Sequence, residues 1–186
     1  KGISRSMDGL TLKGELVYLR ALEPEDLDLI FKIENDEDLW ELSTTLTPFS
    51  KFLLKHYLKN AHKDIYEAKQ LRLVVCKAAN DEALGMIDLF DFDPRNHRAG
   101  LGILIFSKVE RGKGYGAEAL KLITKYAFKR LELHQLYANI LEENAPSIKL
   151  FEKQGFERVG LKKDWTRVGG SFKNEYLYQL IHNDVH

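Results

Sequence analysis

The segment "VERGKGYGAEAL", Val109–Leu120, decides how this chain is interpreted. Three glycines occupy every second position, with Lys113 and Tyr115 between them, and the segment leads from a predicted strand into a predicted helix. Glycine has no Cβ, so the backbone can adopt positive φ and approach a ligand closely. The first turn of a helix presents unpaired N–H groups and a partial positive charge. The segment therefore predicts a pyrophosphate-binding turn. A glycine-rich helix entry that binds nothing is the alternative.

Two familiar phosphate-binding motifs do not fit this turn. The dinucleotide fingerprint needs G-x-G-x-x-G, whereas the spacing here is G-K-G-Y-G. The P-loop motif, G-x-x-x-x-G-K-[ST], is absent from the sequence.

Hydrophobic periodicity and turn residues predict the other elements along the chain. We expect helices at Glu23–Asp36, Lys51–Asn60 and Ala117–Leu131, and from Asn144 to a C-cap at Gly155. We expect strands at Leu16–Leu22, Leu71–Lys77, Ala83–Phe92, Ala99–Phe106, Leu136–Glu142, Phe156–Lys163 and Asn174–Ile181. The order is βααβββαβαββ. The strand, helix and strand around the glycine turn form a parallel crossover within an otherwise antiparallel sheet.

Composition indicates one ordinary globular domain. The chain has 186 residues, 44% of them hydrophobic, and a formal net charge of zero. We expect residues 1–13 to be a leader and residues 14–186 to form a single domain. Zero net charge and the lack of a long apolar run argue against nucleic-acid or membrane partners. The spacing of the six histidines predicts no metal site. We expect a cytoplasmic protein, and the single Cys76 is compatible with that.

Arg111, Gly114 and Gly116 match the R/Q-x-x-G-x-G/A signature of the GNAT superfamily of N-acyltransferases. Residues 143–156, "ENAPSIKLFEKQGF", resemble that family's N-x-x-S/A-x-x-x-Y/F-x-x-x-G-F block. Residues 17–36 resemble its first strand and helix. The chain is most similar to bacterial spermidine N-acetyltransferases and ribosomal-protein N-terminal acetyltransferases. The resemblance implies an α/β (α+β) fold, with a mixed, mostly antiparallel sheet splayed at an acetyl-CoA site and flanked by helices.

The resemblance also implies how acetyl-CoA binds. Its pyrophosphate would contact the turn, which comprises Glu110, Arg111, Gly112, Lys113, Gly114, Tyr115 and Gly116. Its pantetheine arm would pair with the backbone of Ile103, Leu104 and Ile105, like an added strand. The Ile103 N–H would polarise the thioester carbonyl. Asn144, Ser147 and Phe151 would line the other side, and no metal is expected.

The chain departs from its relatives at the groups that move protons. Phe151 occupies the position of the tyrosine that acts as general acid in the spermidine enzymes, and phenylalanine cannot donate a proton. Ser147 is a candidate acid, although it could instead hydrogen-bond the start of its helix. Gly100 occupies the position where related enzymes often carry a glutamate base. The base stays open among Asp88, Asp91, Asp93 and His97; our prediction names Asp91 and His97.

Residues 23–41 hold nine acidic side chains and one lysine. An acidic rim would attract a polycation, so Glu34, Glu37 and Glu41 are predicted to bind the substrate. A solvated helix face is the alternative. The leading hypothesis is acetylation of a small primary amine, a polyamine or diamine such as spermidine. Acetylation of a protein N-terminus and a weakly catalytic acyl-CoA-binding module remain open. The resemblance also implies a homodimer or a higher homo-oligomer.

Overall fold

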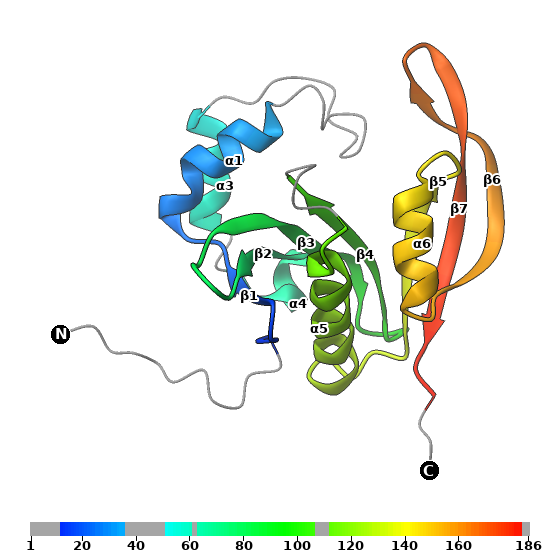
Figure 1. Cartoon of the computed structure of the whole chain (residues 1–186), viewed down its shortest axis with the longest axis horizontal. Helices are drawn as coiled ribbons and strands as arrows, with labels where there is room; N and C mark the ends of the chain where they lie inside the picture. Colours follow the sequence, from blue (N-terminus) through cyan, green and yellow to red (C-terminus); the bar gives the residue numbers. More distant parts are fainter. Residues whose placement is uncertain (1–11, 36–50, 61–62, 107–111, 184–186) are drawn as a thin grey trace.

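The computed structural model describes residues 12–35, 51–60, 63–106 and 112–183. They form one seven-stranded sheet with helices on both sides (Figure 1). The strands are β1 (Val17–Ala21), β2 (Leu71–Lys77), β3 (Ala83–Asp93), β4 (Arg98–Ile105), β5 (Gln135–Leu141), β6 (Glu157–Val168) and β7 (Ser171–Ile181). The helices are α1 (Leu27–Glu34), preceded by the 3-10 turn η1 (Pro24–Asp26), α3 (Lys51–Asn60), α4 (Ile65–Ala68), α5 (Tyr115–Lys129) and α6 (Ala145–Lys153).

The predicted order of elements is confirmed, with one addition. Sequence periodicity did not indicate α4, because a single helical turn is too short to show a period. The turn is fixed locally instead: the Asp64 carboxylate accepts a hydrogen bond of 3.0 Å from the Glu67 backbone N–H. The last two strands are longer than predicted and run on to a hairpin turn at Gly169 and Gly170, both of which have positive φ.

The sheet order is β1-β2-β3-β4-β5-β7-β6. Every neighbouring pair is antiparallel except β4 and β5, which are parallel, as the sequence predicted. Pairing between β4 and β5 covers only Arg98–Gly100 against Gln135–Tyr137. From Leu101 to Ile105, β4 still pairs with β3 and no longer with β5. The two halves of the sheet therefore splay apart after Gly100.

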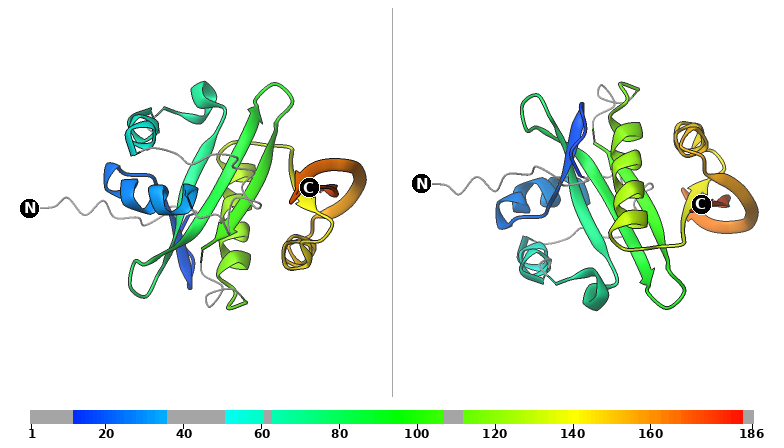
Figure 2. Two further views of the ribbon diagram at one scale, coloured as in Figure 1. Left: turned by 90° about the horizontal axis from the view of Figure 1, so that it is seen from above. Right: turned by 90° about the horizontal axis from the view of Figure 1, so that it is seen from below.

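Two hydrophobic clusters lie on opposite faces of the sheet. Helices α5 and α6 contribute to the larger cluster, with Ile123 and Phe151 packing against residues such as Ile87 and Leu136. Helices α1 and α3 cover Met86 on the other face through Ile30 and Leu54. Figure 2 shows α1 and α3 on one side of the central strands and α5 on the other. We call these the α5/α6 face and the α1/α3 face.

Candidate active site

The glycine turn begins α5 without any capping side chain. Gly114 is the N-cap residue with φ +86°, and Gly112 has φ +80°. An L-residue would be strained at either position. A Cβ on Gly116 would lie 3.6 Å from Leu150 of α6 and 3.8 Å from Ile103 of β4. The N-terminus of α5 therefore lies beside α6 and the splayed part of β4.

The side chains in the first turn of α5 anchor the helix to the fold. The Glu118 carboxylate accepts hydrogen bonds from the backbone N–H groups of Glu15 and of Leu16, the latter at 2.8 Å. Tyr115 packs against the α5/α6 core, and the Lys77 ammonium lies 5.5 Å from the centre of its ring. Lys113 is exposed. Glu110 and Arg111 lie outside the described residues.

The predicted strand segment Ile103–Ile105 lies in the splayed part of β4. Its side chains are half-buried. Ile103 and Ile105 point towards Gly116 on the α5/α6 face, while Leu104 points to the other face. The backbone edge that would face β5 in a continuous sheet carries no strand pairing here. Such an edge is suited to an extended ligand that binds as an added strand.

Asn144 caps the helix that faces this segment. Its side-chain Oδ1 accepts a hydrogen bond of 3.2 Å from the Ser147 backbone N–H. Asn144 therefore satisfies the start of α6, and the Ser147 hydroxyl is not required for that task. Ser147 is half-buried. Because the carboxamide oxygen serves the cap, a bound ligand would meet the amide nitrogen of Asn144.

Phe151 lies in the hydrophobic core. It is 3% exposed, and its ring meets Phe156 edge to face with centroids 5.0 Å apart. A ring in this position adds packing, and it offers no proton.

The candidate bases occupy four different environments. Asp88 lies on the α1/α3 face in a two-point ion pair with Arg72, at 2.9 Å from Nε and 3.0 Å from Nη2. Asp93 accepts hydrogen bonds from the backbone and side chain of Asn96, which hold its pKa below the usual range. Asp91 is exposed at an irregularity in β3, with φ +47°.

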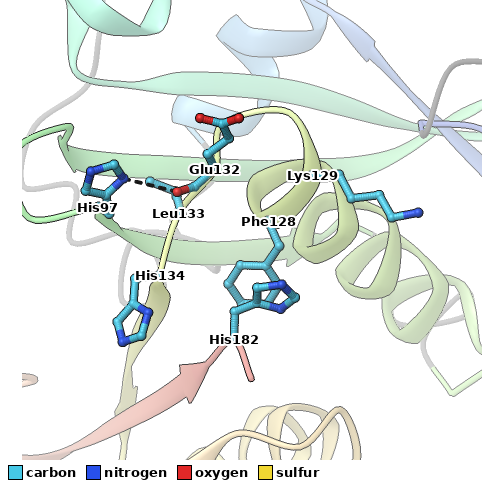
Figure 3. A pocket seen from close by; sticks show the side chains of 7 residues that line it. All are labelled: His97, Phe128, Lys129, Glu132, Leu133, His134 and His182. Carbon is cyan, nitrogen blue, oxygen red and sulfur yellow. Dashed lines mark hydrogen bonds between the residues drawn. The ribbon is translucent and has the colours of Figure 1, made fainter. Parts of the chain in front are cut away.

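His97 lies far from the glycine turn. Its Nδ1 is 3.1 Å from the carbonyl oxygen of Glu132, and it lines a pocket at the C-terminal end of α5 (Figure 3). Helix α5 has 15 residues, which at about 1.5 Å per residue separates this end from the turn by about 20 Å. The structure thus does not bring His97 to the turn. In the part of the chain that the structure describes, no group of three or more His, Cys, Asp or Glu side chains could hold a metal ion.

The structure describes only part of the acidic segment, residues 23–41. Glu37 and Glu41 lie outside the described residues, and Glu34 is the last residue of α1. Asp26 is buried and makes two hydrogen bonds of 2.8 Å with the Arg20 guanidinium. Arg20 holds the pKa of Asp26 below its usual range. One of the nine acids is therefore structural, and it does not belong to a substrate-attracting rim.

The splayed sheet and the glycine turn together define an acyltransferase fold. Residues 17–157 match the acetyltransferase (GNAT) domain family, and the chain belongs to this family of N-acetyltransferases. The chain is 29% identical to the spermidine N(1)-acetyltransferase of Escherichia coli K12 over 158 residues, which cover 85% of this chain and 82% of that protein. It is 28% identical to the uncharacterized N-acetyltransferase p20 of Bacillus licheniformis over 172 residues, which cover 92% of this chain and 96% of that protein.

Solved structures show the same fold. The crystal structure of spermidine N-acetyltransferase from Vibrio cholerae, in complex with CoA and spermine, superposes with a TM-score of 0.79 at 24% identity. The superposition covers 90% of this chain and 96% of that one. No helix among the described residues is long and apolar enough to cross a membrane.

Proposed function

We propose that this protein transfers an acetyl group from acetyl-CoA to a primary amine of a small polyamine or diamine, such as spermidine. One observation carries the proposal: β4 leaves β5 after Gly100, directly beside the glycine-rich N-terminus of α5. This arrangement offers an anion site and an open strand edge in one place. An acyl-CoA molecule has the matching parts, a pyrophosphate and an extended amide-containing arm.

The residues present fit acetyl-CoA as the donor. Gly112 and Gly114 have positive φ, and among the described residues, the chain neighbours of Gly112 aside, no atom lies within 4 Å of a Cβ built on Gly112. The backbone N–H groups from Glu110 to Gly116 would hold the pyrophosphate, and Arg111 and Lys113 would add positive charge. The arm would pair with Ile103–Ile105 and meet the amide nitrogen of Asn144. The spermidine enzyme from Vibrio cholerae, which shares this fold, binds CoA.

The chemistry needs an electrophile, an acid and a base. The backbone N–H of Ile103 would stabilise the negative charge that develops on the thioester oxygen. Ser147, which is released from capping by Asn144, would supply the proton for the departing thiolate. Phe151 has a packing role in this scheme, and the amine reacts once it has lost its proton.

A polyamine is favoured as the acceptor by the acidic segment and by the relatives. Glu34, Glu37 and Glu41 would attract a polycation. The relatives from Escherichia coli and Vibrio cholerae act on spermidine by name. One neighbour is a dodecameric spermidine N-acetyltransferase, so a homo-oligomer belongs to the proposal. The buried, unpaired Cys76 agrees with a cytoplasmic location.

The first test measures CoA release from acetyl-CoA with spermidine, spermine, putrescine and a serine-headed peptide offered in parallel. Saturable turnover with the polyamines supports the proposal. Turnover with the peptide alone indicates an N-terminal acetyltransferase, and acetyl-CoA binding without turnover indicates a binding module.

A matched pair of variants tests the donor site. Gly112→Glu adds a negative charge at φ +80°, and Gly170→Glu makes the same change at φ +83° in the β6–β7 turn; at both positions a Cβ would have no atom of the described, non-neighbouring residues within 4 Å. Gly112→Glu should weaken acetyl-CoA binding about tenfold or more, since about 1.4 kcal/mol of lost interaction already does so. Gly170→Glu should bind normally. Equal affinities in the two variants would place the donor elsewhere.

A further inference from the structure

Three residues form a row across the middle of the sheet: Phe90 of β3, Gly100 of β4 and Tyr137 of β5. Gly100 pairs with Phe90 on one side and with Tyr137 on the other. The Gly100–Tyr137 pair is the last one before β4 and β5 separate. Above the glycine the two rings meet edge to face, with centroids 5.9 Å apart and planes at 89°. The ring pair therefore lies at the apex of the splay.

Gly100 is what allows the rings to meet. A Cβ at this position would lie 2.2 Å from Cε2 of Phe90, well inside contact distance. The Phe90 ring thus fills the space that a side chain at residue 100 would need. Gly100, where the family resemblance predicts a glutamate, is covered here by an aromatic pair.

Asp91 directly follows Phe90 of this pair and lies in a bulge of β3. Strand alternation places neighbours on opposite faces, yet Leu89 and Phe92, three residues apart, both lie in the α5/α6 core. The register shift between Phe90 and Asp93 accounts for this, because it inserts one extra residue. Asp91 has φ +47°, a strained conformation for a residue that is not glycine.

The pKa of the Tyr137 phenol depends on the charge of Asp91. Burial raises the pKa of the Tyr137 phenol, and the negative charge of Asp91 raises it further, while Arg98 lowers it. Asp91 belongs to β3 and Tyr137 to β5, with β4 between them, so the charge of Asp91 acts on the phenol across one strand. Two ion pairs lie near this row: Arg98 is 3.6 Å from Asp93, and Arg72 binds Asp88 in the next row along the sheet, while Glu157 of β6 lies in the row of Tyr137 beyond Gln179.

The ring pair lies on the face of the sheet opposite to the start of α5. On the α5/α6 face, Gly116, Ile103 and Leu150 close around the start of α5, where the donor's phosphates would bind. Phe90 projects to the opposite, α1/α3 face, since it neighbours Gly100 and Gly102 there. Two aromatic rings and a carboxylate are the groups that recognise an ammonium ion.

We propose that Tyr137 and Asp91 form the proton relay that deprotonates the acceptor amine; this inference rests on the proposed transfer reaction. The ammonium N–H bond breaks, its proton moves to Tyr137 Oη, and the phenol's own proton moves to the Asp91 carboxylate and then to water. The neutral nitrogen forms a bond to the thioester carbon, and the C–S bond breaks. Ser147 gives its proton to the thiolate, and the second nitrogen proton replaces it on Ser147, giving the amide and CoA-SH.

The relay makes a prediction that depends on pH. A primary ammonium has a pKa of about 10.4, so only about one molecule in a thousand is neutral near pH 7.4. An enzyme without a proton acceptor should lose most of its rate at that pH. The rate of such an enzyme should recover as the pH rises, because the solution itself then deprotonates the amine.

The test compares Tyr137→Phe with Tyr66→Phe, using every amine that the wild type acetylates. Tyr66 is a matched control because its ring also meets a β3 phenylalanine edge to face, Phe92 at 5.1 Å. For Tyr137→Phe, kcat should fall about 100-fold near pH 7.5, the loss should shrink towards about pH 9.5, and the KM for acetyl-CoA should stay within about twofold. Tyr66→Phe should match the wild type. A pH-independent loss, or no loss, would overturn the relay.

A second measurement does not need turnover. The pKa of the Tyr137 phenol, followed by NMR with ¹³C-labelled tyrosine, should exceed 10 in the wild type and fall in Asp91→Asn. Asparagine tolerates positive φ, so this variant keeps the bulge. An unchanged pKa in Asp91→Asn would overturn the relay. Turnover with a peptide in place of polyamines would refute the proposed acceptor, while the relay would still be judged on that peptide.

Discussion

Gly100 and Gly102 provide a sharp test of the ring pair, because they lie on the same strand and face the same ring. A Cβ on Gly100 would lie 2.2 Å from the Phe90 ring, whereas a Cβ on Gly102 would lie 3.8 Å from it, an ordinary contact. Gly100→Ala should therefore force Phe90 to move, and Gly102→Ala should fit without adjustment.

The magnitude follows from two opposing effects. Overpacking a core costs about 1–3 kcal/mol, while replacing glycine by alanine regains about 0.4–1 kcal/mol from the unfolded chain. Gly100→Ala should lose about 1–2 kcal/mol of unfolding free energy net, which is about 2–8 °C in Tm for a chain of this size. Gly102→Ala should equal the wild type or exceed it slightly.

Thermal and urea unfolding of the two variants measure this difference. Phe90→Leu in combination with Gly100→Ala serves as the internal check, since shortening the ring should make room for the new methyl group. The double variant should lose less stability than the sum of the single losses, with a coupling of about 1 kcal/mol. Equal stability of Gly100→Ala and Gly102→Ala would refute the account of why residue 100 is glycine.

Three further predictions concern other parts of the site. Ser147→Ala should lower turnover and leave Tm unchanged, since the hydroxyl does not cap α6; normal turnover would remove Ser147 as the acid. Asn144→Ala should lower the unfolding free energy by about 1 kcal/mol through the lost cap, and calorimetry should also show weaker acetyl-CoA binding. Asp26→Asn should cost about 1–2 kcal/mol near neutral pH, because the Arg20 pair lowers the pKa of Asp26 in the folded state. That contribution is complete above the unfolded pKa of about 3.9 and is lost as pH falls through the lower folded value, so the Tm difference should close in acid; a constant difference would contradict the ion-pair account.

The order of elements could be predicted because each signal is local. The apolar run in Leu71–Lys77 and the apolar spacing of Lys51–Asn60 are contained within single segments, and both elements have the predicted bounds. The glycine turn is also local, since the strand, the glycines and the helix follow one another directly. The parallel crossover then follows from connecting two strands through one helix.

The proton-moving groups could not be ranked from sequence. The sequence offers four equivalent candidates for the base, and the structure places them in four different environments. Asp88 forms an ion pair, and Asp91 lies at a strained bulge. Asp93 belongs to a hydrogen-bonded turn, and His97 lies at the far end of α5. The sequence contains no signal for Tyr137, which we propose as part of the relay. It stands in a strand of apolar residues, and nothing within "LYANILE" distinguishes it from a packing residue.

The sequence by itself determined the fold family, the position of the glycine turn and the absence of a side chain at Gly100. Only the tertiary structure shows which side chains occupy the space left by Gly100. Phe90, Gly100 and Tyr137 are distant along the chain, and only the registers of β3 with β4 and of β4 with β5 bring them into one row. The physical reason is that periodicity reports which way a side chain faces, whereas strand pairing sets which side chains from other strands it meets.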